Sequence, residues 1–243
     1  MTVLSVNVNK IALLRNSRGR DYPSVLGFVD QVIGLGVKGI TVHPRPDERH
    51  ITRRDVYEIS EFLKDKAGVE FNIEGYPSED FLALVAEVHP DQCTLVPDKP
   101  EQLTSDHGWD IPANRDQLKA VLQQLREQGI RSSIFLDADP QAIAEVPAVG
   151  ADRIELYTED YASSFGTEDQ QQVHDRYAQA AQKAHELGVG INAGHDLDLH
   201  NLPEFLKIPH ILEVSIGHAL VVESLQQGVA SVISQYLALC DSG

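Results

Sequence analysis

Cysteine is scarce in this sequence and forms no pattern. The chain has 243 residues and two cysteines, Cys93 and Cys240, which lie far apart and form no C-x-x-C motif. A disulfide framework and a zinc knuckle both need several cysteines at short, regular spacings, so neither kind of site is indicated. We expect both thiols to be reduced and packed in the interior.

Long hydrophobic runs and an excess of positive charge are also missing. No apolar run approaches the roughly 18 residues that cross a bilayer. The first basic residue is Lys10 and no long apolar segment follows it, which argues against a signal peptide. The formal net charge is -17, whereas a phosphate backbone or an anionic membrane surface is bound by excess Lys and Arg. We therefore expect a cytoplasmic protein that binds neither nucleic acid nor membrane.

The glycine-rich motifs of nucleotide-binding proteins are absent as well. The sequence contains no G-x-G-x-x-G motif and no P-loop, so nicotinamide and nucleoside triphosphate cofactors lose support. No low-complexity linker divides the chain. We predict one domain that spans residues 1–243.

Short apolar segments alternate with amphipathic segments along the whole chain. Strands are predicted at 3–8, 40–42, 69–73, 93–96, 132–136, 153–157, 189–192 and 212–216. Helices are predicted at 23–35, 53–64, 79–88, 115–128, 140–149, 169–187, 203–207 and 219–239. This alternation predicts a single (β/α)₈ barrel of the α/β class. An open doubly wound sheet is the alternative, but its usual glycine-rich turn is missing after the first strand.

Polar side chains follow the predicted strands, where barrel enzymes carry their active sites. The loop after the second strand holds His43, Arg45 and His50, stiffened by two prolines, and Thr52 with Asp55 resembles a capping box. Seven arginines also fall within the first 54 residues, although the whole chain is acidic. They are Arg15, Arg18, Arg20, Arg45, Arg49, Arg53 and Arg54. A local cationic patch on an acidic body suits a small anionic substrate.

Two Gly-His pairs follow the seventh and eighth strands, the region where barrels frequently bind phosphate. Gly194-His195 and Gly217-His218 predict a phosphate site, because glycine lets the backbone approach a ligand and a helix start offers free N–H groups. Glu74 ends an apolar strand and is predicted to face the barrel mouth. With His43 and His195 it would give three proton-transfer groups around one substrate. A structural ion pair between Glu74 and an arginine is the alternative.

Metal and lysine chemistry have weaker support in the same residues. The sequence has neither H-x-H nor H-E-x-x-H, and His195 and His200 are too loosely spaced to indicate a metal site. Only Lys10 and Lys99 lie near strand ends, so a Schiff base on lysine is weakly indicated. A metal site and a Schiff base on lysine therefore stay the weaker alternatives from the residues alone.

Five motifs together resemble the pyridoxine 5'-phosphate synthase family over nearly the whole chain. They are VNVNKIALLRNSRG, VHPRPDERHI, NIEGYP, NAGH and IGHA, in the family's order. The resemblance implies a (β/α)₈ barrel that assembles into a homo-octamer and needs no metal or cofactor. It also implies that 3-amino-2-oxopropyl phosphate condenses with 1-deoxy-D-xylulose 5-phosphate, with release of phosphate and water. The substrate amine can form an imine itself, so no catalytic lysine is required.

The resemblance further implies a role for each site residue. The acid and base residues would be His43, Glu74 and His195, with Glu155 stabilising charged intermediates. The deoxyxylulose phosphate would be held by Asn9, Lys10, Arg45, His50 and Thr104. The amino ketone phosphate would be held by Asn7, Arg18, Asp196, Gly217 and His218.

This chain departs from the family pattern at three of these positions. In one form of the family, Asp and His occupy the positions of Asn9 and Lys10, and glycine occupies the position of Asp196. Lys10 keeps a hydrogen-bond donor but is less suited than histidine to shuttle protons. Two other functions remain open from the residues alone: a barrel isomerase or aldolase acting on a sugar phosphate, and a non-catalytic protein that binds phosphorylated metabolites.

Overall fold

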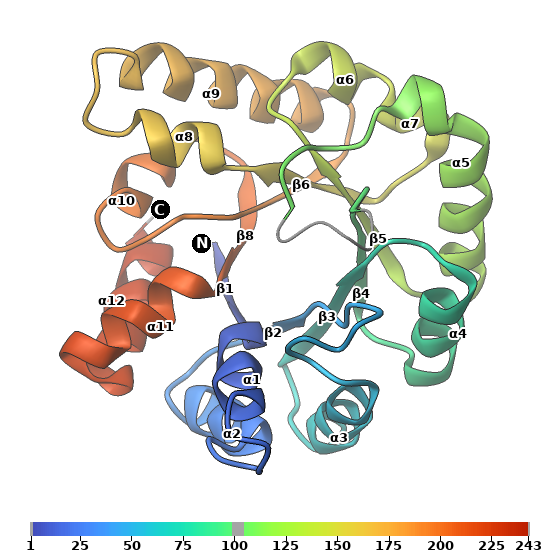
Figure 1. Ribbon diagram of the computed structural model, residues 1–243. Coiled ribbons are helices and arrows are strands. Elements are labelled where there is room, and N and C mark those ends of the chain that lie inside the picture. The colour runs from blue at the N-terminus through green and yellow to red at the C-terminus, as the bar shows by residue number, and fades with distance from the viewer. Residues whose placement is uncertain (1, 99–104, 243) are drawn as a thin grey trace.

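Eight parallel strands close into a barrel in chain order, and the last strand pairs with the first (Figure 1). The computed structural model describes residues 2–98 and 105–242. The strands are β1 (Val3–Asn7), β2 (Gly39–Val42), β3 (Glu70–Gly75), β4 (Gln92–Leu95), β5 (Arg131–Leu136), β6 (Arg153–Tyr157), β7 (Gly190–Gly194) and β8 (Ile211–Ile216). The predicted (β/α)₈ barrel is confirmed, and each predicted strand lies within two residues of its observed bounds.

Helices surround the barrel on its outer side (Figure 1). They are α1 (Asn9–Asn16), α2 (Val25–Gly34), α3 (Arg53–Leu63), α4 (Glu79–Val88), α5 (Ile111–Glu127), α6 (Pro140–Ala144), α7 (Val146–Val149), α8 (Glu159–Ser164), α9 (Gln170–Glu186), α10 (Leu202–Phe205), α11 (His218–Gln227) and α12 (Val229–Ser242). None of the helices in the described ranges is long and apolar enough to span a membrane. The two cysteines are free and buried, as predicted.

The helix predictions need four corrections. The segments 140–149 and 219–239 are each two helices, because Pro147 cannot donate a helical hydrogen bond and Gly228 has φ +82°. Helices α1 and α8 were not predicted. Each begins two residues after the end of a strand, and the polar start of α1 was interpreted as a binding loop.

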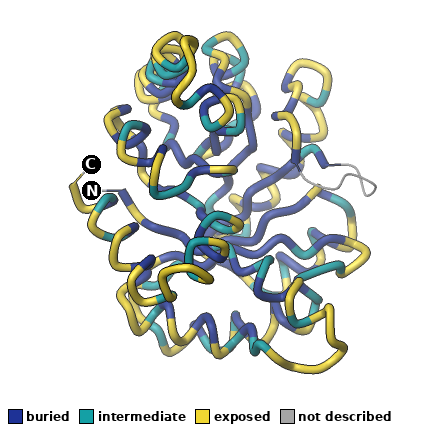
Figure 2. Tube along the Cα trace, turned by 60° about the vertical axis from the view of Figure 1, so that its left-hand side comes forward, coloured by how far each residue is buried: buried dark blue, intermediate teal, exposed yellow. Residues whose placement is uncertain are grey.

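Side chains alternate between the two faces of the barrel wall. On β3, Phe71 and Ile73 point outward into the apolar layer beneath the helices. The alternate residues Glu70, Asn72 and Glu74 point inward. Figure 2 shows the strands as a buried centre with exposed turns outside. The inward residues are largely polar, so the barrel interior is lined by hydrogen-bonding groups.

A chain of hydrogen bonds crosses this interior between four neighbouring strands. The Ser5 and Thr41 hydroxyls lie 2.7 Å apart, the Asn72 amide donates to Thr41 over 3.3 Å, and Thr94 donates to the Asn72 amide oxygen over 3.0 Å. Near the N-terminal ends of the strands, the Arg131 guanidinium contacts both carboxylate oxygens of Glu70. Because buried polar groups are costly when unpaired, this network fixes the inward side chains in place.

The predicted capping box at the start of α3 is confirmed. The Thr52 hydroxyl accepts a hydrogen bond from the Asp55 backbone N–H, and the Asp55 carboxylate accepts one from the Thr52 backbone N–H over 2.7 Å. Asp55 also accepts a hydrogen bond of 2.8 Å from Arg15, which lies in α1. The cap therefore anchors the end of the loop that carries His43, Arg45 and His50.

We expect Thr52→Ala to lower the free energy of unfolding by about 1 kcal/mol, because an orphan N–H of the first helical turn loses its acceptor. Urea denaturation of the purified protein measures this change. Thr52→Ser keeps the acceptor and is the control, so it should retain most of the wild-type stability. Equal unfolding midpoints for wild type and Thr52→Ala would contradict this account of the cap.

Candidate active site

His43 and Glu74 meet at the C-terminal end of the barrel. Glu74 lies near the end of β3 and His43 directly follows β2, and the His43 Nδ1 atom is 3.9 Å from the Glu74 carboxylate. In the described part of the chain, the basic side chain nearest to the Glu74 carboxyl group is therefore a histidine and not an arginine. Both side chains are almost completely buried. The predicted position of Glu74 at the barrel mouth is the one observed.

Burial changes which member of this pair holds a proton. Burial raises the pKa of Glu74 well above its ordinary value, and the nearby carboxylates of Glu155 and Asp98 raise it further. Burial lowers the pKa of His43 well below its ordinary value, and the positive charge of Arg45 adds to this shift. At neutral pH the imidazole of His43 is thus neutral, and the carboxyl group of Glu74 keeps its proton to higher pH than an ordinary glutamate. The pair can donate a proton from one side and accept one on the other.

Two asparagines from the end of β1 fix the backbone of His43. The Asn9 side-chain oxygen accepts a hydrogen bond of 3.0 Å from the His43 backbone N–H. The Asn7 side-chain oxygen accepts one of 3.0 Å from the Asn9 backbone N–H. Asn9 therefore holds the loop that carries His43. The spacing of the strands in the sequence does not reveal this hydrogen bond.

Arg45 is held beside these groups by a buried ion pair with Asp98. The exposed fractions of the two side chains are 5% and 2%. Asp98 also accepts a hydrogen bond of 2.8 Å from the Ser105 hydroxyl, while its Oδ1 atom has no hydrogen-bond partner among the described residues. Asp98 was not assigned a role from the sequence. A carboxylate three residues after β4, together with the arginine-rich loop after β2, is the pattern that would have indicated this pair.

His50 and Lys10 lie on the same side of the site. The His50 Nδ1 atom accepts a hydrogen bond of 2.9 Å from the Ile51 backbone N–H. Burial lowers the pKa of His50 to about 4, and the charges of Arg45 and Lys10 add to this shift. Because Lys10 also lowers the pKa of His195, its ammonium lies within electrostatic reach of both histidines. His50 is therefore a neutral donor and acceptor at neutral pH.

His195 follows β7 with its ring against Tyr157. The two ring centroids are 4.9 Å apart at an interplanar angle of 67°. The His195 Nε2 atom is 3.6 Å from the Asp196 carboxylate. Burial lowers the pKa of His195, whereas the negative charge of Asp196 opposes that shift. Asp196 thus acts on the histidine beside it.

Glu155 points into the barrel from the middle of β6. Burial, with a smaller contribution from Glu213, raises the pKa of Glu155 to about 8. Its Oε2 atom has no hydrogen-bond partner among the described residues. A Cβ atom on Gly194 would lie 2.7 Å from the Glu155 Oε1 atom, so only glycine leaves room for this carboxyl group. The carboxyl group of Glu155 is therefore protonated at neutral pH.

The end of β8 brings Gly217 and His218 next to β1. A Cβ atom on Gly217 would lie 3.1 Å from the Asn7 Cβ atom, so the backbone of α11 begins in close contact with Asn7. His218 is exposed at the first position of that helix. The free N–H groups of a helix start suit an anion.

The remaining site predictions fall outside this cluster. Arg18 is exposed just beyond the end of α1. Thr104 lies outside the described residues. Most of the other predicted site residues are connected at the barrel mouth by direct contacts or by close electrostatic effects. They are Asn7, Asn9, Lys10, His43, Arg45, His50, Glu74, Glu155, His195, Asp196 and Gly217. Within residues 2–98 and 105–242, no three His, Cys, Asp or Glu side chains are grouped as metal ligands.

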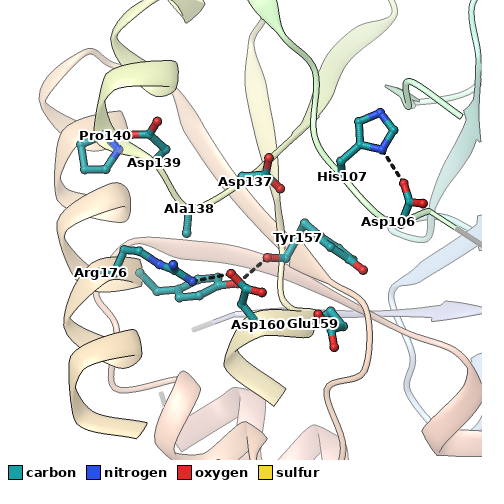
Figure 3. A pocket seen from close by; sticks show the side chains of 11 residues that line it. Asp106, His107, Asp137, Ala138, Asp139, Pro140, Tyr157, Glu159, Asp160 and Arg176 are labelled. Atoms are coloured by element: carbon teal, nitrogen blue, oxygen red, sulfur yellow. Dashed lines mark hydrogen bonds and ion pairs between the residues drawn. The ribbon is translucent and has the colours of Figure 1, made fainter. Parts of the chain in front are cut away.

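A pocket of about 490 Å³ adjoins the cluster on the side of β5 and β6 (Figure 3). Its wall includes Tyr157, whose ring also contacts His195, and an ion pair of 2.7 Å between Arg176 and Asp160. Several further carboxylates line it, among them Asp137 and Glu159. The pocket is thus more acidic than the cationic side of the site around Arg45.

Comparison with known proteins gives one family over almost the whole chain. Residues 4–242 match the family model described as pyridoxal phosphate biosynthesis protein PdxJ. A protein of Bacteroides thetaiotaomicron named pyridoxine 5'-phosphate synthase is 51% identical over 237 residues, which is 97% of this chain and 98% of that protein. A protein of Leptospira biflexa with the same name is 47% identical and covers 100% of this chain and 98% of its own.

Solved structures with a similar fold are much more distant in sequence. Thiamine phosphate pyrophosphorylase from Pyrococcus furiosus aligns with a TM-score of 0.62 at 12% identity, over 99% of this chain and 96% of its own. N-(5'-phosphoribosyl)anthranilate isomerase from the same organism gives 0.61 at 9% identity, over 100% of both chains. At these identities the similarity concerns the barrel fold alone.

Replacing Glu155 should change how stability depends on pH. The folded pKa of about 8 lies above the unfolded value of 4.5, so the folded protein loses stability as pH rises between these values. Glu155→Gln removes this loss, and its free energy of unfolding relative to wild type should rise by a few kcal/mol from about pH 5 to about pH 8. Urea denaturation at several pH values measures the difference.

The matched control for this prediction is Glu168→Gln, which changes an exposed carboxylate in the same way. Its stability relative to wild type should not vary over that pH range. A parallel pH dependence for wild type and Glu155→Gln would show that Glu155 is ionised throughout the range.

Proposed function

The chain belongs to the pyridoxal phosphate biosynthesis protein PdxJ family, and from this premise we propose that it is a pyridoxine 5'-phosphate synthase. The proposed reaction condenses 3-amino-2-oxopropyl phosphate with 1-deoxy-D-xylulose 5-phosphate and releases phosphate and water. The observation that carries the proposal is the buried pair of Glu74 and His43 at the barrel mouth. It supports the proposal because the condensation needs an acid and a base at the same carbon.

The first condensation step illustrates the use of this pair. When the amine of one substrate attacks the ketone of the other, a C–N bond forms, the C=O π bond breaks, and one of the two amine protons moves to the oxygen, which becomes a hydroxyl group. Loss of that hydroxyl as water requires a proton, which Glu74 can donate, and the nitrogen must lose a proton, which His43 can accept. We assign the same kind of role to His195 on the opposite side of the mouth. Glu155 would stabilise charged intermediates.

Two groups of residues would hold the two phosphorylated substrates. We assign Asn9, Lys10, Arg45, His50 and Thr104 to the deoxyxylulose phosphate. We assign Asn7, Arg18, Asp196, Gly217 and His218 to the amino ketone phosphate. The first assignment is supported by the buried guanidinium of Arg45, because a planar fork of N–H donors matches a phosphate group. The second is supported by the helix start at Gly217 beside Asn7.

We also propose that the protein is cytoplasmic and assembles into a homo-octamer without a metal or organic cofactor. Apolar side chains on two adjoining helices support self-association. They are Leu13 and Leu14 on α1, and Val222 and Leu225 on α11, of which Leu225 is 79% exposed. Exposed apolar groups that gather on one face are typical of interfaces. Sedimentation velocity would measure the assembly.

The central test supplies both substrates to the purified protein in the presence of EDTA. We expect pyridoxine 5'-phosphate, detected by its absorbance, together with released phosphate, and we expect both to require both substrates. Turnover of a single substrate would instead identify an isomerase or aldolase. Replacing His43 or His195 by alanine should lower kcat by about 10²–10⁴, the usual contribution of a positioned acid or base.

The assignment of Arg45 predicts a selective change in substrate binding. Arg45→Gln should raise KM for deoxyxylulose phosphate by about 10-fold to 100-fold, because a charge-assisted hydrogen bond contributes roughly 1.5–3 kcal/mol. KM for the amino ketone phosphate should stay close to its wild-type value. Steady-state kinetics with one substrate varied at a time measures both constants. The matched control is Arg54→Gln, an exposed arginine of α3 that pairs with Glu58. An equal rise in both KM values for Arg45→Gln would refute the assignment.

A further inference from the structure

The turn that carries His195 has an unusual backbone. His195 has φ +95° and the next residue, Asp196, has φ +56°. Residues with a Cβ atom seldom adopt positive φ, and two in succession persist only where the surroundings hold them. The position of the His195 ring therefore depends on contacts that restrain this turn.

Thr158 supplies the main restraint. It directly follows β6, and its exposed fraction is 0%. Its backbone N–H donates to the Gly194 carbonyl over 3.2 Å, and its hydroxyl is shared between the Gly194 carbonyl, at 2.8 Å, and the His195 carbonyl. A single buried side chain thus binds both carbonyls at the start of the turn.

Two further contacts complete the restraint. The Asn201 side-chain amide donates to the Asp196 carbonyl over 3.0 Å, on the far side of the turn. The Tyr157 ring lies against the His195 ring, and it also packs on Phe135 with ring centroids 5.3 Å apart. Tyr157 is the last residue of β6, and Figure 3 shows its side chain among those that line the pocket. The His195 ring is thus fixed by its own backbone and by one aromatic neighbour.

We propose that Thr158 is a positioning residue, whose buried hydroxyl holds the carbonyls of Gly194 and His195 and so aims the His195 ring into the barrel mouth. The inference rests on the proposed function, in which His195 transfers protons. Thr158 itself is not expected to touch substrate. Its contribution is to keep a strained turn in the one conformation that presents the ring.

The test replaces the hydroxyl by a methyl group of similar size. Thr158→Val should lower kcat by about 10-fold to 100-fold, because small misplacements of a reacting group are costly. KM for the deoxyxylulose phosphate should stay within about threefold of wild type, since the residues assigned to that substrate lie outside this turn. Thr158→Ser restores the hydroxyl and should recover most of kcat. If Thr158→Val lowers kcat and Thr158→Ser does not recover it, the proposal is overturned.

The pH profile gives a readout that a purely structural role would not change. Burial lowers the pKa of His195, Asp196, Glu159 and Asp98 oppose that shift, and Lys10 adds to it. A ring released from its position gains solvent, so its pKa should rise toward the ordinary value of about 6.5. The acid limb of the kcat profile in Thr158→Val should therefore move to higher pH. An unmoved limb with a normal kcat would contradict the proposal.

Thr2 offers a matched control at the opposite end of the barrel. Its hydroxyl is also buried and donates to a backbone carbonyl, that of Ile211, over 2.9 Å. Thr2→Val should lose stability as Thr158→Val does, because it also loses a buried hydrogen bond, but it should keep the wild-type kcat. An equal loss of kcat in both variants would make the effect at Thr158 nonspecific and overturn the proposal. If circular dichroism shows that Thr158→Val is unfolded, Thr158→Ala and Thr158→Ser are compared instead, with the same expected outcomes.

The two proposals fail in different ways. A wild-type protein that makes no product from the two substrates refutes the synthase function. A wild-type protein that is active, together with a Thr158→Val variant of unchanged kcat, refutes only the positioning role.

Discussion

Charge buried inside the barrel must be compensated, and this chain compensates it differently at the two ends. Near the N-terminal ends of the strands, arginines meet carboxylates: Arg131 binds Glu70, and Arg153 lies 3.8 Å from Glu213. Further along the strands, the inward carboxyl groups of Glu74 and Glu155 have raised pKa values. Burial also raises the pKa of Glu213, but Arg153 and Arg131 oppose that shift. Burial of an acid without a matching cation favours its protonated form. The N-terminal end of the barrel is therefore fixed by ion pairs, whereas Glu74 and Glu155 keep their protons to higher pH.

The same constraint explains why the cationic residues of the mouth are arranged as they are. The guanidinium of Arg45 is paired with Asp98, so it adds little net charge to the interior. The two histidines nearest to it, His43 and His50, have lowered pKa values and stay neutral. The mouth thus combines neutral bases and buried acids with the positive charge of Lys10, which acts on both His50 and His195. That combination suits a condensation between two anionic molecules, which must bind charge and move protons in the same small volume.

The sequence was sufficient for the barrel and for most of the residues at its mouth. Strand positions follow from short β-branched runs, and the inward residues follow from their period of two, which is why His43 and Glu74 were expected at the rim. Periodicity carries no information about which loops meet, so the pair of Arg45 with Asp98 and the contact of Asn9 with His43 were not predicted. Helix α1 was missed because its polar start was interpreted as a binding loop.

The alternation of polar and apolar residues along β3 also bears on how the chain reaches its fold. If this strand slipped by one residue against its neighbours, Phe71 and Ile73 would enter the polar interior, and Glu70, Asn72 and Glu74 would face the apolar helices. Both changes are unfavourable, so the interior groups discriminate against misaligned strand pairing. Parallel strands that are apolar on both faces lack this discrimination. The carboxyl groups proposed for catalysis thus also select the correct register during folding.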